Sequence, residues 1–169
     1  LVVKEEKMSL KSNFTRPTYL GYMAILRIAV GYHFVSVAWP KVTGPFLQGK
    51  ILSAELVKSV GKDPLAFHRA FITGVVLPHA PFVAHLVAFG ELAIGLSLLA
   101  GCLVRLSASF AAFHNLNILL AIAVANGGPQ LGLNRIFIVL ELMFVLSSAG
   151  VALGLDGLLK KRFPNSKLF

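Results

Sequence analysis

Charged residues are scarce in this sequence. Asp, Glu, Lys and Arg together make up 14% of its 169 residues, whereas roughly a quarter of the residues in soluble domains are charged. Hydrophobic residues make up 56% of the chain. This composition excludes a soluble globular domain and predicts an integral membrane protein.

The chain also has a single cysteine, Cys102. One cysteine excludes an internal disulfide, a CxxC dithiol and an all-cysteine metal site. The sequence contains no Gly-rich phosphate loop, no HExxH, no GxSxG and no Cys/His metal spacing. We therefore predict no metal site and no autonomous hydrolase or nucleotide enzyme. Any sulfur or metal redox chemistry would have to come from a partner protein.

Apolar runs long enough to cross a bilayer, which takes about 20 residues, account for nearly all the hydrophobic sequence. They cover residues 18–38, 81–100, 104–125 and 131–153. The sequence therefore predicts an all-α, four-helix membrane domain over residues 18–160. Basic tails at 1–17 and 161–169 flank this domain.

The segment 40–80, between the first two spans, is predicted to cap the bundle at the membrane surface. Ile51, Leu52, Leu56 and Val60 have the spacing of a short amphipathic helix. A second apolar stretch, 65–77, is too short and too interrupted by proline to span. We expect His68 and His79, which fall in this cap, to face water.

Lys and Arg residues gather in the two tails and at Arg105, between the second and third spans. The positive-inside rule then predicts a multi-pass plasma-membrane protein with both termini cytoplasmic. The formal net charge is +9. We expect the basic residues to contact anionic membrane lipids and not nucleic acid. The tail 1–17 lacks the apolar core of a signal peptide, and the start residue is left open between Leu1 and Met8.

Each predicted span carries a polar or charged residue near its centre. These residues are Arg27, Glu91, the pair His114 and Asn115, and Glu141. A charge at the bilayer centre costs about 2.5–3.5 kcal/mol on insertion scales, so such residues face inward and pair. We therefore predict one layer in which Arg27 pairs with Glu91, with Glu141, or with both.

Two interpretations of this layer stay open. In the first, Arg27 and a glutamate form a structural clamp that sets the helix register. In the second, Glu91, Glu141 or His114 handles protons, while Arg27, Glu91 and Asn115 hold the head group of a lipid-soluble ligand such as a quinone.

Two further histidines, His33 and His85, fall at matched depth on neighbouring spans. Neutral imidazoles in that arrangement could ligate haem or a pigment. Nothing in their spacing is specific, so hydrogen-bonded polar side chains are the favoured interpretation.

Several motifs, in order, resemble the DoxX/DoxD family of four-helix membrane proteins. The central run contains Gly90, Glu91, Gly95, Leu96, Leu98, Leu99, Gly101 and Arg105. The first span and the residues just after it supply Arg27, Gly31, Trp39 and Lys41, and a closing element is formed by Gly154, Leu155 and Asp156.

The resemblance implies a plasma-membrane bundle that works with partner subunits, because DoxD-type members are subunits of thiosulfate:quinone oxidoreductases. It also implies a quinone near Arg27 and Glu91. The function expected is the membrane subunit of a quinone-linked oxidoreductase. The alternative is a non-catalytic accessory or assembly subunit of a larger respiratory or photosynthetic complex. A transporter is not favoured, since no proline or glycine pair breaks two of the spans.

Overall fold

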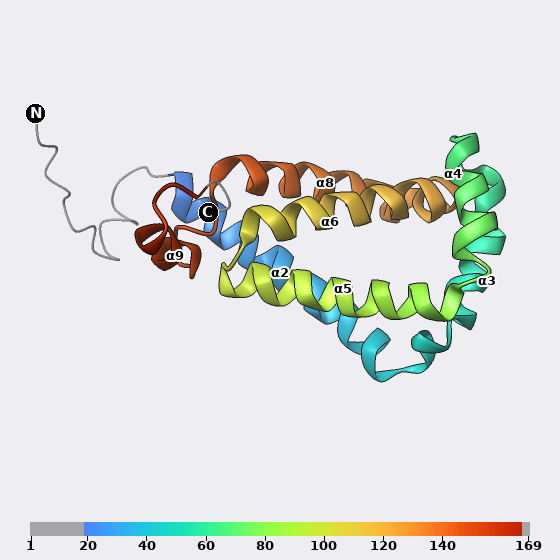
Figure 1. The fold of residues 1–169 in the computed structure, drawn as a ribbon. Coiled ribbons are helices and arrows are strands. Elements are labelled where there is room, and N and C mark those ends of the chain that lie inside the picture. Colours follow the sequence, from blue (N-terminus) through green and yellow to red (C-terminus); the bar gives the residue numbers. More distant parts are fainter. Residues whose placement is uncertain (1–18, 167–169) are drawn as a thin grey trace, which may run out of the picture.

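The computed structural model describes residues 19–166, and this part of the chain folds into helices joined by turns (Figure 1). The predicted tail 1–17 lies outside the described residues. The elements follow in the order α2 (Tyr19–Thr43), η1 (Pro45–Gln48), α3 (Lys50–Ser59), η2 (Val60–Lys62), α4 (Ala66–Phe71), η3 (Ile72–Val76), α5 (Ala80–Ala100), α6 (Val104–Ile118), η4 (Leu119–Ala123), α7 (Val124–Asn126), α8 (Gly128–Ser147) and α9 (Asp156–Arg162).

Four helical stretches are long and apolar enough to cross a membrane. They are Leu20–Thr43, Ala80–Ala100, Val104–Asn126 and Gly128–Ser147. The third is continuous through α6, η4 and α7, where η4 is a short π-helical stretch. This arrangement confirms the prediction of an all-α, four-helix membrane bundle.

Two of the helix ends differ from the predicted ones. The first helix runs past residue 38 to Thr43, with Pro40 inside its last turn. The fourth helix ends at Ser147 rather than 153, because Ser148 has a left-handed backbone (φ 52°) that terminates it. Because of these shifts, Glu141 and Arg27 do not lie at the midpoints of their helices, where they were predicted. Glu141 lies in the second half of α8, and Arg27 lies in the first half of α2.

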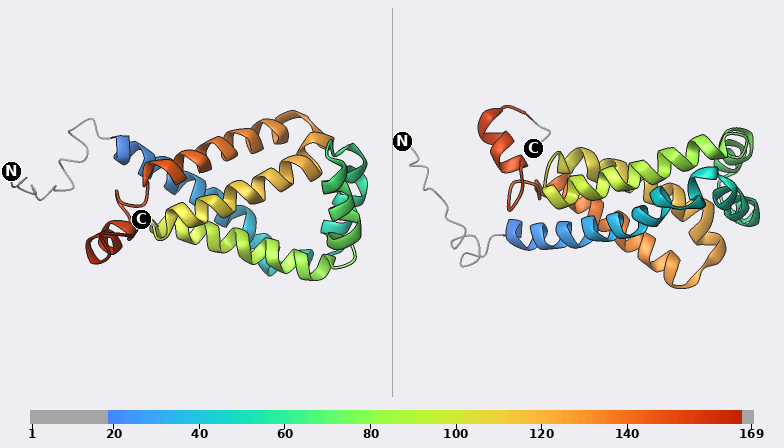
Figure 2. Two further views of the ribbon diagram at one scale, coloured as in Figure 1. Left: turned by 45° about the horizontal axis from the view of Figure 1, so that its top comes forward. Right: turned by 90° about the horizontal axis from the view of Figure 1, so that it is seen from below.

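The bundle is built from two helix pairs, α2 with α5 and α6 with α8 (Figures 1 and 2). Gly31 and Gly95 let α2 and α5 approach closely. A Cβ on Gly95 would lie 2.7 Å from Val35 Cγ2, and one on Gly31 would lie 2.9 Å from the backbone nitrogen of Leu99. Small residues are what membrane helices use at such contacts.

The two ends of the bundle differ. At the cap end, α3, α4 and η3 cross the ends of α5 and α6 (Figure 1). Leu56, Ile72, Val76 and Ala121 form their common apolar cluster, which confirms the amphipathic helix predicted around Leu56. The terminal end holds the start of α2, the turn between α5 and α6, and α9 (Figure 2).

At the terminal end, Asp156 caps the start of α6. Its carboxylate accepts hydrogen bonds from the backbone N–H groups of Leu103 at 2.6 Å and Val104 at 2.9 Å. The first N–H groups of a helix have no partner within the helix, so an aspartate there is stabilising. The Gly154, Leu155, Asp156 element noted in the sequence is thus a structural closure of the bundle.

Candidate functional site

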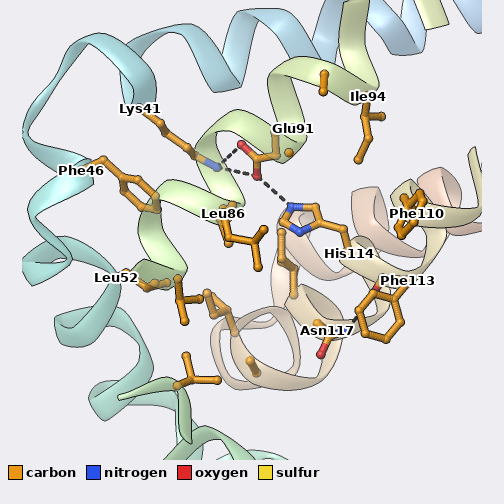
Figure 3. Close-up of a pocket in the computed structure, with 18 of the residues that line it drawn as sticks. Lys41, Phe46, Leu52, Leu86, Glu91, Ile94, Phe110, Phe113, His114 and Asn117 are labelled. Atoms are coloured by element: carbon orange, nitrogen blue, oxygen red, sulfur yellow. Dashed lines mark hydrogen bonds and ion pairs between the residues drawn. The ribbon is translucent and has the colours of Figure 1, made fainter. Parts of the chain in front are cut away.

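A cavity of about 1000 Å³ lies between α5 and α6 and extends under the cap. We call it the groove. Its walls are mostly apolar, and four of the side chains that line it are Leu86, Ile94, Phe110 and Phe113 (Figure 3). The groove exists because α5 packs mainly on α2 and α6 mainly on α8, so α5 and α6 diverge toward the cap end (Figure 1).

A polar cluster made of Lys41, Glu91 and His114 lies in the wall of this groove (Figure 3). Lys41 Nζ donates to both carboxylate oxygens of Glu91, each at 2.6 Å. His114 Nε2 lies 2.8 Å from Glu91 Oε1. Three helices, α2, α5 and α6, therefore meet at one carboxylate.

The side chains of this polar cluster are largely buried, so their contacts contribute to the stability of the fold. The side chain of Glu91 is 3% exposed, and those of Lys41 and His114 are 28% and 18% exposed. An isolated carboxylate at that depth would be costly, so its pairing with an ammonium group is a condition of stability. Lys41 Nζ also lies 5.4 Å from the ring centroid of Phe46, within the range of a cation–π contact.

Lys41 is a site residue that was not predicted from the sequence, because the first span was predicted to end at residue 38 and the cap to begin at residue 40. A signal was present. The inward face of α2 follows Arg27, Gly31 and Ala38 at intervals of four and seven, and three residues further lies Lys41. Continuing that face through Pro40 would have placed Lys41 on the side that meets α5.

A second polar chain joins the cap to the groove. His68 Nδ1 contacts the Asp63 carboxylate, and His68 Nε2 lies 3.1 Å from Asn117 Oδ1, which belongs to a groove residue. His68 is 5% exposed, so the expectation that it faces water is wrong. His79 is exposed. His68 is buried because its ring bridges the start of α4 to α6.

Arg27 does not join Glu91 or Glu141, so the predicted layer with an Arg–Glu pair is wrong. Its guanidinium donates instead to backbone carbonyls at the terminal end, including Leu98 O and, at 2.9 Å, Leu153 O. Carbonyls in the last turn of a helix lack partners within the helix and attract a cation. Arg27 therefore ties the end of α5 to the segment after α8.

Asn115 and Glu141 form a third, separate cluster. Asn115 Nδ2 donates to Glu141 Oε1 at 2.6 Å, and both side chains are buried between α6 and α8. Neither residue lines the groove. The structure therefore separates them from Glu91 and His114, with which they were predicted to form one layer.

His33 and His85 face different neighbours. The His33 ring stacks on Phe137 of α8, with centroids 4.6 Å apart. His85 Nδ1 lies 2.8 Å from the carbonyl of Pro81 in its own helix. The two rings are thus not arranged as a ligand pair. Over residues 19–166, no group of three or more His, Cys, Asp or Glu side chains is placed to hold a metal ion.

The family model described as "TQO small subunit DoxD" matches residues 22–169. The chain belongs to the DoxD family. This confirms the resemblance drawn from Arg27, Glu91 and the closing Asp156. The match includes every residue of the groove, from Lys41 to Ile122. No curated protein and no solved structure matches this DoxD chain.

Proposed function

We propose that this DoxD chain is the membrane subunit of a quinone-linked oxidoreductase of the thiosulfate:quinone type, and that Lys41, Glu91 and His114 bind the quinone head group. The observation that supports this most is the polar cluster in the wall of a mostly apolar groove between two helices long enough to span a membrane. Ligand sites commonly combine apolar walls with a few converging polar groups.

The donor set fits a quinone. The head group offers carbonyl oxygens that accept hydrogen bonds, and its reduced form offers hydroxyl groups that donate them. Lys41 and His114 supply donors, and the Glu91 carboxylate supplies an acceptor. Asn117 adds a further amide at the groove wall. Phe110 and Phe113 add aromatic surface for the ring (Figure 3).

A bound quinone supplies the capacity to take up two electrons together with two protons. The electrons would come from a sulfur donor oxidised by a partner subunit. Within this chain, Glu91 and His114 are close enough to pass a proton between Oε1 and Nε2. Lys41 holds the Glu91 carboxylate in place. Asn115 and Glu141 stay outside this assignment because they pair with each other between α6 and α8 and do not line the groove.

Quinone binding by the purified protein tests the proposal. Trp39 is the only tryptophan and lies two residues from Lys41, so quenching of its fluorescence reports an added quinone. We expect Glu91→Gln to raise the Kd about tenfold or more, since it removes the carboxylate that holds the two donors, Lys41 and His114, in place. Glu141→Gln is the matched control, because the same change is made outside the groove.

The alternative, a non-catalytic accessory or assembly subunit, predicts a different outcome. If Glu91→Gln binds quinone as well as the wild type but unfolds more easily, the cluster is a structural clamp. Co-purification in mild detergent separates the two functions further. A small redox partner together with quinone supports the oxidoreductase, whereas recovery with a large respiratory or photosynthetic complex supports the accessory subunit.

We further propose that the protein lies in the plasma membrane with both termini cytoplasmic. Lys160, Lys161 and Arg162 close α9 at the terminal end, which favours the cytoplasmic side. A cysteine introduced at the exposed Lys58, in a Cys102→Ser background, should react with an impermeant reagent from the extracytoplasmic side. Reaction only from the cytoplasmic side would contradict this orientation.

A further inference from the structure

The groove continues well past the polar cluster, toward the terminal end. Along α6 its wall follows Phe110 and Leu106, four residues apart on one face of the helix, and continues to Leu103, the residue before α6. From His114 to the start of α6 at Val104 this wall spans about 15 Å at 1.5 Å per residue. We call this part the lower groove.

The lower groove is apolar and open to the side. Leu96, Leu106 and Phe110, which line it, are 53%, 41% and 60% exposed. In a membrane this exposure is toward lipid, so an apolar chain can enter sideways from the bilayer.

The hydroxyl groups that line the far end of the lower groove already have partners. Ser97 Oγ on α5 and Ser107 Oγ on α6 lie 2.5 Å apart, and Ser97 also donates to the carbonyl of Cys102. These hydroxyls hold α5 and α6 together where the groove ends. A ligand needs no polar group to satisfy them, so the end of the groove suits an apolar terminus.

We propose that the lower groove holds a single linear apolar tail, whose head group lies at Lys41, Glu91 and His114. This inference rests on the proposed function and adds a second part to the same site: the stretch of the cavity from His114 to Cys102, which takes the tail of the quinone. The tail and the head occupy one continuous cavity of about 1000 Å³, within the range of known ligand sites.

A phospholipid fits this cavity less well. Lys41 already neutralises Glu91 at 2.6 Å, so a phosphate there would face a buried carboxylate without a free cation from the cluster. Like charges held close together in a low-dielectric site repel strongly. The cluster therefore favours an uncharged head group.

Cys102 provides a built-in reporter, because it is the only cysteine of the chain and lines the end of the lower groove. The wild-type protein in mild detergent is alkylated with N-ethylmaleimide and followed by intact mass spectrometry. Three probes are compared: a quinone with a long polyisoprenoid tail, the same ring with one isoprene unit, and phosphatidylglycerol.

We expect the long-tailed quinone to slow alkylation about tenfold at about ten times its Kd, because only the unoccupied fraction reacts. The short-tailed quinone should bind, as judged by Trp39 quenching, without slowing alkylation. If the long-tailed quinone binds but alkylation is as fast as before, the tail assignment is wrong and the proposed head site still stands. If no quinone binds at all, both the tail assignment and the proposed head site are wrong. Equal protection by phosphatidylglycerol shows a lipid site and overturns the assignment.

A pair of variants gives an independent test. Leu106→Trp fills the lower groove and is expected to weaken binding of the long-tailed quinone about tenfold, while the short-tailed quinone binds as before. Leu142→Trp, on the lipid-exposed face of α8, is the matched control and should change neither affinity. Equal weakening of both quinones by Leu106→Trp, or no weakening of either, overturns the inference.

Discussion

Arg27→Met is expected to lower the free energy of unfolding by about 3–5 kcal/mol, because it breaks a buried hydrogen-bond network. The guanidinium is fully buried and donates to the carbonyls of Leu98, Leu99, Ala152 and Leu153. Methionine fills similar space but leaves these carbonyls without their donor, and each unsatisfied buried group costs about 1–3 kcal/mol. Denaturant unfolding in mild detergent measures the loss.

The matched control is Arg135→Met, which makes the same change at an exposed position of α8. We expect it to change stability by less than about 0.5 kcal/mol, as surface substitutions usually do. Quinone affinity of the folded Arg27→Met protein should equal that of the wild type. If Arg27→Met instead weakens quinone binding strongly without a loss of stability, Arg27 belongs to the quinone site and is not a structural tie between helix ends.

Lys41→Met is expected to destabilise the protein by about 3 kcal/mol, toward the lower end of the range for a broken buried ion pair. The substitution removes both 2.6 Å contacts to the Glu91 carboxylate. His114 keeps one of the oxygens hydrogen-bonded, which limits the cost. The same unfolding measurement reports the change.

The double variant Lys41→Met with Glu91→Gln separates stability from function. Removing both charges avoids an unpaired buried carboxylate, so we expect stability within about 1 kcal/mol of the wild type. Quinone affinity should stay low, because the double variant lacks both the ammonium donor and the carboxylate. If the double variant is as unstable as the sum of the single ones, the two residues do not act as a pair. If it binds quinone normally, the cluster is not the head-group site.

Much of the fold could be predicted because the bilayer imposes it. A chain in lipid has to satisfy its backbone groups internally, so each apolar run of sufficient length becomes a helix. The inward face of α5 was also readable, since Ala84, Ala88, Glu91 and Gly95 recur at helical spacing and are all buried. The burial of Glu91 and Glu141 follows from the cost of charge in hydrocarbon.

The partners of these buried groups could not be read in the same way. Periodicity shows that Arg27, Glu91 and Glu141 turn inward, but a partner depends on which helices touch and at what register. The close approach of Gly31 to Gly95 sets the register of α2 against α5, and it brings Lys41 rather than Arg27 within reach of Glu91. The turn at Ser148 folds back the segment that follows α8, so that the carbonyls of Ala152 and Leu153 come within reach of Arg27.

The sequence therefore determined the number of spans, their apolar faces and the residues that turn away from lipid, because these depend on hydrophobicity and on the helical repeat of a single segment. The tertiary structure decided that Arg27, Glu91 and Glu141 lie in three separate polar clusters and that the cluster of Glu91 faces a groove. Those outcomes depend on contacts between residues far apart in the chain, such as Glu91 with His114 and Asn115 with Glu141. Local periodicity carries no information about such pairs.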